Sequence, residues 1–131
     1  MTTAQILAAI ATVSCAVLAV WVGGPVTRWV LGRVDGASPD PTTGVVAAAG
    51  ILKGGRTIGV LERCAVFLGM LAGWPEALVG VIALKGLGRF AELRGDTEGA
   101  AERFIIGSFT SLLWAATLGG LARLALTHAG F

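Results

Sequence analysis

Charged side chains are scarce in this sequence. Asp, Glu, Lys and Arg make up 14% of its 131 residues, against about 25% in soluble domains. The hydrophobic fraction is 55%, and the mean hydropathy is +0.81. So little charge excludes an ordinary water-soluble globule, and so much apolar content excludes an intrinsically disordered chain. The composition therefore predicts a small integral membrane protein.

Histidine and cysteine are also scarce, which narrows the chemistry open to the chain. The single His is residue 128, and the two cysteines, Cys15 and Cys64, lie in apolar stretches. A buried thiol behaves as a small hydrophobe, and these cysteines have no spaced partners for a metal or a disulfide. No phosphate-cradling loop is present either. We therefore expect no metal, no cofactor and no enzymatic activity, and the net charge of +2 does not indicate a nucleic-acid partner.

The long apolar runs predict an all-α membrane protein that forms a single domain over residues 1–131. Four transmembrane helices are expected, at about 5–31, 57–73, 75–94 and 100–126. The first has no charge before Arg28 and exceeds the ~20 residues that cross a bilayer. A cleaved signal peptide is the alternative, but its usual basic start is missing. Within this span, Gly23-Gly24-Pro25 predicts a kink or an interfacial break.

Two segments, about 32–53 and 94–99, predict loops between the spans. The first is polar over 32–43, and its apolar part, 44–52, is too short to cross a bilayer. Nine of the ten Lys and Arg residues lie on or beside these loops, and Arg123 alone lies on the other side. Basic residues favour the cytoplasmic side of a membrane. The excess of Arg over Lys, eight to two, suggests a bacterial genome rich in G and C. We therefore expect a bacterial inner-membrane protein with both loops in the cytoplasm and both termini outside.

The second and third spans are expected to form a tight hairpin around the junction between Gly73 and Trp74. Residues whose numbers add up to about 147 then lie at similar depth, as Glu62 and Lys85 do. Both lie roughly 15 Å from the turn, close to the membrane midplane. A charge at the centre of a membrane helix costs about 2.5–3.5 kcal/mol. The hairpin register therefore predicts an ion pair between Glu62 and Lys85.

Further charges and serines extend this pair into a candidate polar cluster. Its expected members are Glu62, Arg63, Lys85, Arg89, Glu92, Glu102, Arg103, Ser108 and Ser111. Lys85, Arg89 and Glu92 share one helix face by their spacing. The last span carries small residues that allow close helix packing, at Ser108, Ser111, Ala115, Gly119 and Ala122. Positive charge exceeds negative, so the cluster could hold an anionic lipid head group at the inner leaflet. Purely structural ion pairing is the first interpretation of the cluster, ahead of a bound ligand and of contact with a partner protein.

Three segments of the chain carry a resemblance. They are GRTIGVLER at 55–63, KGLGRFAEL at 85–93 and AERFIIGSFTS at 101–111. This pattern resembles one in uncharacterised small bacterial multi-pass membrane proteins, written GRxIGxLER, KxxxRFxEL and AExFIIGS. The resemblance covers about residues 54–116 and leaves the first helix unmatched. It implies no activity, and it marks the charged cluster already identified.

The sequence as a whole favours a non-enzymatic membrane protein. Its charged cluster is expected to stabilise the bundle and to bind an anionic lipid head group or a partner subunit, with a homo-oligomer as one form of partner. The alternative is a small homo-oligomeric, proton-coupled transporter that uses Glu62. Small multidrug-resistance transporters are similar in architecture, but their essential acid lies in a first helix, which here has none. A Ser-Lys nucleophile from Ser108 or Ser111 with Lys85 is less simple than seryl hydrogen bonding between helices.

Overall fold

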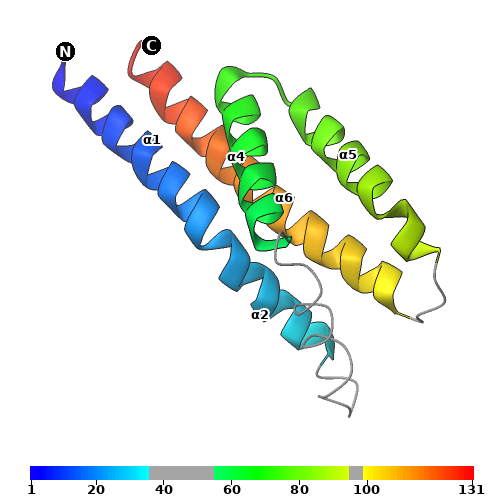
Figure 1. Ribbon diagram of the computed structural model, residues 1–131. Coiled ribbons are helices and arrows are strands. Elements are labelled where there is room, and N and C mark those ends of the chain that lie inside the picture. Colours follow the sequence, from blue (N-terminus) through cyan, green and yellow to red (C-terminus); the bar gives the residue numbers. More distant parts are fainter. Residues whose placement is uncertain (36–54, 95–98) are drawn as a thin grey trace.

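The computed structural model describes residues 1–35, 55–94 and 99–131, and the regular secondary structure of these parts is all α-helix. The helices are α1 (Thr3–Trp21), α2 (Gly23–Asp35), α4 (Gly55–Ala72), α5 (Glu76–Leu93) and α6 (Ala100–His128). In Figure 1, α2 continues the direction of α1, α6 returns antiparallel to both, and the two chain ends lie together. Most of the predicted loop at 32–53, and residues 95–98 of the predicted loop at 94–99, lie outside the described residues.

The α1 and α2 helices are separated by a single residue, Val22. A capping box begins α1, in which Thr2 N–H donates to Gln5 Oε1 at 2.9 Å and Gln5 N–H donates to Thr2 Oγ1 at 3.3 Å. The helix ends at Trp21, and α2 starts at Gly23. Pro25 has no N–H to donate, and its ring crowds the preceding turn. The helix is interrupted at Val22, directly before the Gly23-Gly24-Pro25 segment that predicts a kink or break, and this divides the expected span 5–31 into two helices.

The α6 helix lies at the centre of the bundle and packs against α1, α2 and α4. The buried core is built mostly from small side chains, at Ala19 on α1, Val66 and Phe67 on α4, and Leu112, Ala115, Ala116 and Ala122 on α6. A Cβ at Gly119 would lie 2.8 Å from the carbonyl oxygen of Phe67, so α4 and α6 touch through their backbones there. The predicted small-residue face of this helix is confirmed.

The α4–α5 hairpin turns at Gly73, which has a φ of +78°. Trp74 N–H donates to the Gly69 carbonyl oxygen at 2.8 Å and closes the end of α4. A Cβ at Gly69 would lie 2.4 Å from the Cβ of Ala77, so the two helices meet closely beside the turn. The predicted hairpin around the Gly73–Trp74 junction is therefore confirmed, and Figure 1 shows α5 returning beside α4.

The prediction of four transmembrane helices with both termini outside is wrong. Within the described ranges only two helices are long and apolar enough to cross a membrane, at Thr3–Trp21 and Ala101–His128, with mean hydropathies of 2.0 and 1.6. The other three helices are excluded because α4 and α5 contain too many charged residues and α2 is too short. Three charged residues lie within the 18 residues of α4 and four within the 18 residues of α5, while α2 has 13 residues. Each central charge costs about 2.5–3.5 kcal/mol.

Large apolar side chains face outward on all the described helices. Examples are Val13 on α1, Trp29 on α2, Leu61 on α4, Leu84 on α5 and Leu113 on α6. Monomeric soluble proteins rarely expose apolar patches of more than a few hundred Å². The outer surface of the bundle thus fits an apolar environment, in agreement with the two helices that could cross a membrane.

Candidate functional site

An open cleft of 1110 Å³ lies beside the break between α1 and α2, where parts of α2, α4, α5 and α6 face one another. Six of its described lining residues carry charge, namely Arg28, Arg56, Glu62, Arg63, Lys85 and Arg103. Five of these six are cations and one is a carboxylate. Ser108 and Ser111 of α6 line the same cleft. The site is therefore strongly positive and offers hydroxyl groups as well.

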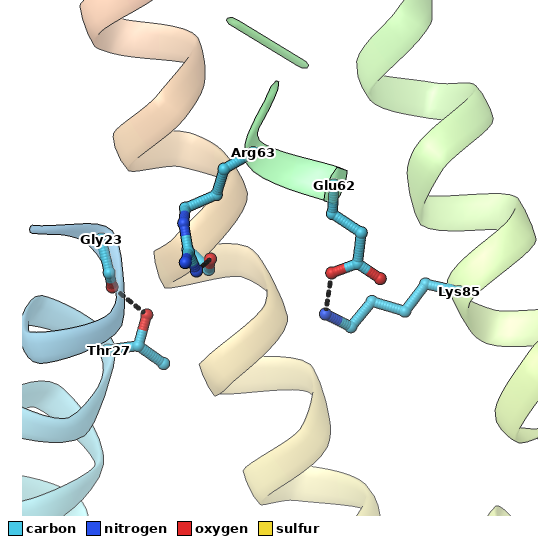
Figure 2. A network of polar contacts seen from close by, with 6 residues as sticks. Gly23, Thr27, Glu62, Arg63 and Lys85 are labelled. Carbon is cyan, nitrogen blue, oxygen red and sulfur yellow. Dashed lines mark hydrogen bonds and ion pairs between the residues drawn. The ribbon is translucent and has the colours of Figure 1, made fainter. Parts of the chain in front are cut away.

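Glu62 and Lys85 form an ion pair across the α4–α5 hairpin. Lys85 Nζ donates to Glu62 Oε2, and Figure 2 shows the two side chains pointing toward each other. Their side chains are 10% and 21% exposed, so water reaches the pair only in part. The ammonium also lies 5.9 Å from the ring centroid of Phe104. This pair confirms the register that the hairpin arithmetic predicts.

Arg63 follows Glu62 on α4 but turns toward α2 and α6 (Figure 2). It is 7% exposed, and Nη1 donates to the hydroxyl of Ser111 at 3.1 Å. Its Nε is buried and has no hydrogen-bond partner among the described residues. Leaving a buried donor without a partner costs about 1–3 kcal/mol, and more where the group is charged. The Arg63 guanidinium is thus a buried cation whose Nε is not satisfied by the described residues.

The α1–α2 break makes room for Arg63. A Cβ at Gly23 would lie 2.5 Å from Arg63 Cδ and 3.0 Å from Nε, so only a glycine fits there without a shift. The hydroxyl of Thr27 donates to the Gly23 carbonyl oxygen at 2.8 Å. Trp114 Nε1 donates to the Leu18 carbonyl oxygen at 3.1 Å, which ties α6 to the last turn of α1. The break is therefore part of the site.

The predicted cluster is only partly brought together. Six of its members line the cleft, namely Glu62, Arg63, Lys85, Arg103, Ser108 and Ser111. Glu102 is exposed at the start of α6 and does not line the cleft. Arg89 and Glu92 lie on α5, but their side chains are outside the described parts of the structure. The predicted cluster was expected to lie between the second, third and fourth spans, which correspond to α4, α5 and α6.

Sequence reasoning missed the wall that α2 contributes. Arg28 and Gly24 belong to it, and both fall in the predicted first span, 5–31. The signal that could have found them is Gly23-Gly24-Pro25, because two glycines before a proline leave backbone uncovered where a neighbouring side chain can approach. Among its described side chains, the α2 wall adds a cation to the cleft and no acid.

The donor set of the cleft fits an anion. Guanidinium and ammonium groups bind phosphate and carboxylate through charge-assisted hydrogen bonds. No group of three or more His, Cys, Asp or Glu residues that could hold a metal ion occurs in the described parts of the chain. The described groups of the cleft can bind an anion and neutralise its charge.

The resemblance to small bacterial multi-pass membrane proteins stays a prediction. No family model matches the chain, and neither a curated protein nor a solved structure matches it.

Proposed function

We propose that this protein is a non-enzymatic, multi-pass protein of a bacterial inner membrane that binds the anionic head group of a lipid. In this proposal α1 and α6 cross the bilayer, and the α4–α5 hairpin packs against them. The apolar outer surface and the two sufficiently apolar helices support the membrane location. The charged cleft supports the choice of ligand.

The charge imbalance of the cleft is the observation that carries the proposal. Five cations face one carboxylate among the described lining residues. A basic residue near an anionic membrane surface contributes about 1 kcal/mol of attraction, and basic pockets between membrane helices bind lipid phosphates. Purely structural pairing would call for nearly equal numbers of the two signs. Arg103 has a further interaction of its own. Without it, four cations, Arg28, Arg56, Arg63 and Lys85, still face the single carboxylate of Glu62 among the described lining residues.

The apolar rim of the cleft favours a lipid over a small free anion. Ile58, Leu61 and Leu84 line the cleft and are also exposed on the outer surface. Acyl chains could lie along these side chains while the phosphate reaches the cations deeper inside. A free anion would gain nothing from this rim, because it has no apolar surface to bury.

Native mass spectrometry of the detergent-solubilised protein tests the proposal. The variant is Arg56→Gln, and the matched control is Arg94→Gln, because both arginines are exposed and only Arg56 lines the cleft. Loss of one cation worth about 1 kcal/mol weakens an anionic lipid about fivefold. We expect that loss in Arg56→Gln alone. A wild-type protein that retains no anionic lipid, or an equal loss in both variants, contradicts the proposal.

A second candidate function is transport of an anion coupled to proton movement. The position of Glu62 favours it, because it is the one carboxylate among the described residues of the cleft wall and could carry the proton. In proteoliposomes, Glu62→Gln should abolish proton-coupled flux while the Glu102→Gln control keeps it. Flux that is unchanged in Glu62→Gln would discard this function.

A further inference from the structure

Serine and threonine side chains beyond the first turn of each described helix fall into two groups. In the first group, the hydroxyl donates to the carbonyl oxygen three or four positions earlier, at 2.8–3.0 Å; its members are Thr12, Ser14, Thr27, Thr110, Thr117 and Thr127. Such a bond satisfies the hydroxyl proton where water is excluded. The second group is Ser108 and Ser111 of α6, which make no such bond within the described ranges, and both line the cleft.

Ser111 accepts a hydrogen bond from Arg63 and still has a proton to donate. Arg63 Nη1 donates to Ser111 Oγ at 3.1 Å, so this oxygen is the acceptor of the pair. A hydroxyl also carries one donor proton, and the described residues provide no acceptor for it. Chains of hydrogen bonds polarise one another, so a hydroxyl that accepts from a cation becomes a stronger donor. The buried guanidinium, which is 7% exposed, can therefore act on the cleft through Ser111 without touching a ligand itself.

The described walls of the cleft are rich in donors and poor in acceptors. Arginine and lysine side chains can only donate, and the carboxylate of Glu62 already accepts from Lys85. The hydroxyl of Ser108 makes no hydrogen bond with a described residue. A donor without an acceptor is unfavourable in apolar surroundings. A ligand that fills the cleft therefore has to bring acceptor oxygens for the two hydroxyls.

We propose that Ser108 and Ser111 bind the phosphate oxygens of the lipid head group, and that Arg63 is a positioning residue that orients Ser111. This inference rests on the proposed function, since it names the groups that hold the same ligand. The two serines are three positions apart on α6, so their side chains are neighbours on one helix face. The unesterified oxygens of a phosphate accept from both hydroxyls. The exposed arginines of the cleft, Arg28 and Arg56, neutralise its charge.

Ser108→Ala tests the contact with the ligand, and Ser14→Ala is the matched control. The control makes the same chemical change at an exposed serine of α1, whose hydroxyl donates to the Ile10 carbonyl oxygen at 2.9 Å. Binding is measured to nanodiscs of zwitterionic phosphatidylcholine that contain anionic phosphatidylglycerol. We expect Ser108→Ala to bind about tenfold more weakly than wild type, which is the loss of one hydrogen bond to a charged group. Ser14→Ala should bind as wild type does, and unchanged binding in Ser108→Ala overturns the inference.

The stability of the protein in detergent without phosphatidylglycerol separates ligand binding from a structural role. The Ser108 hydroxyl has no hydrogen-bond partner among the described residues of the bundle, so its removal should not lower the free energy of unfolding. If Ser108→Ala unfolds more easily than wild type under these conditions, the hydroxyl supports the fold, and the inference is wrong.

The role of Arg63 is tested through Ser111. Ser111→Thr and Ser111→Val add side chains of nearly the same shape, and only the threonine keeps a hydroxyl. The threonine variant should therefore bind about tenfold more tightly than the valine variant. Arg63→Lys keeps the positive charge but not the planar guanidinium, so it should weaken binding in the wild type and cause little further loss in the Ser111→Val background. Equal binding of the two Ser111 variants, or equal losses from Arg63→Lys in both backgrounds, overturns the role of Arg63.

The remaining outcomes separate this inference from the proposed function. If wild-type protein binds phosphatidylglycerol and no serine variant weakens that binding, the inference is wrong and the proposed function stands. If wild-type protein binds phosphatidylglycerol nanodiscs no better than phosphatidylcholine nanodiscs, both are wrong. Inorganic phosphate distinguishes a lipid from a free ion. If it binds tightly, displaces the lipid and binds Ser108→Ala more weakly, the hydroxyl site stands and the lipid as ligand is overturned.

Discussion

Substitution of Gly23 by alanine tests whether the break between α1 and α2 exists to admit Arg63. Gly23 is buried, and an added Cβ would lie 2.5 Å from Arg63 Cδ and 3.3 Å from Trp114 Cδ1. The neighbouring Gly24 offers a matched control, because a Cβ there would meet nothing within 4 Å. The two substitutions make the same chemical change one residue apart, so they differ only in what the new methyl group touches.

The expected magnitudes follow from those distances. Forcing an extra methyl group into a packed site costs about 1–3 kcal/mol. Replacing glycine by alanine also restricts the unfolded chain, which stabilises the fold by about 0.4–1 kcal/mol. We therefore expect Gly23→Ala to lower the free energy of unfolding by about 1–2 kcal/mol. Gly24→Ala should leave it unchanged or raise it by up to about 1 kcal/mol.

Reversible unfolding in detergent micelles, followed by the helical circular dichroism signal, measures both variants. Repeating the pair in an Arg63→Ala background identifies the atom responsible, because that protein lacks the Cδ that the new methyl group would strike. The penalty of Gly23→Ala should then shrink by about 1 kcal/mol or more, as coupled sites do. Equal stability of Gly23→Ala and Gly24→Ala, or an unchanged penalty in the Arg63→Ala background, would refute the packing argument.

Two further predictions concern the α4–α5 hairpin. A double-mutant cycle of Glu62→Gln and Lys85→Gln should give a coupling of about 0.5–3 kcal/mol in unfolding, because the pair is mostly shielded from water; a coupling near zero would remove the ion pair as a stabilising contact. Gly73→Ala should cost about 1–3 kcal/mol from strain, since its φ of +78° is unfavourable for a residue with a side chain, and more because the added Cβ would clash with the Arg123 guanidinium. Gly130→Ala has a similar φ of +82° near the chain end, where a Cβ would meet nothing within 4 Å, and equal losses in both glycine variants would show that the contact with Arg123 adds no penalty at the turn.

The local features of this fold could be predicted because they depend on neighbouring residues. Hairpin register follows from the position of the turn, so the pairing of Glu62 with Lys85 could be found by counting outward from Gly73. The break before Pro25 likewise follows from the missing N–H of proline. In both cases the residues that determine the feature lie within one helix or two neighbouring helices.

The number of membrane-crossing helices could not be found in this way. The apolar content of the segments 57–73 and 75–94 predicted two transmembrane helices there. Charged residues interrupt the two helices that form in these segments, α4 and α5.

The role of α2 was missed for a different reason. Arg28 and Arg63 are 35 positions apart in the numbering and share the cleft only because α6 holds α2 beside it, a tertiary contact that no local pattern encodes.

The small residues where α6 packs against α1 and α4 limit which substitutions the sequence can accept. We call these four positions, Ala19, Ala115, Gly119 and Ala122, the small-residue seam. Ala19, Ala115 and Ala122 are fully buried, and Gly119 meets the α4 backbone, so helix spacing is set by main chain and methyl groups. A bulkier residue at any of these four positions cannot be absorbed by rotating a neighbour, and it must push whole helices apart. In saturation mutagenesis, side-chain volume should therefore decide which substitutions are tolerated at the seam. The outward-facing apolar positions should accept apolar side chains of any size.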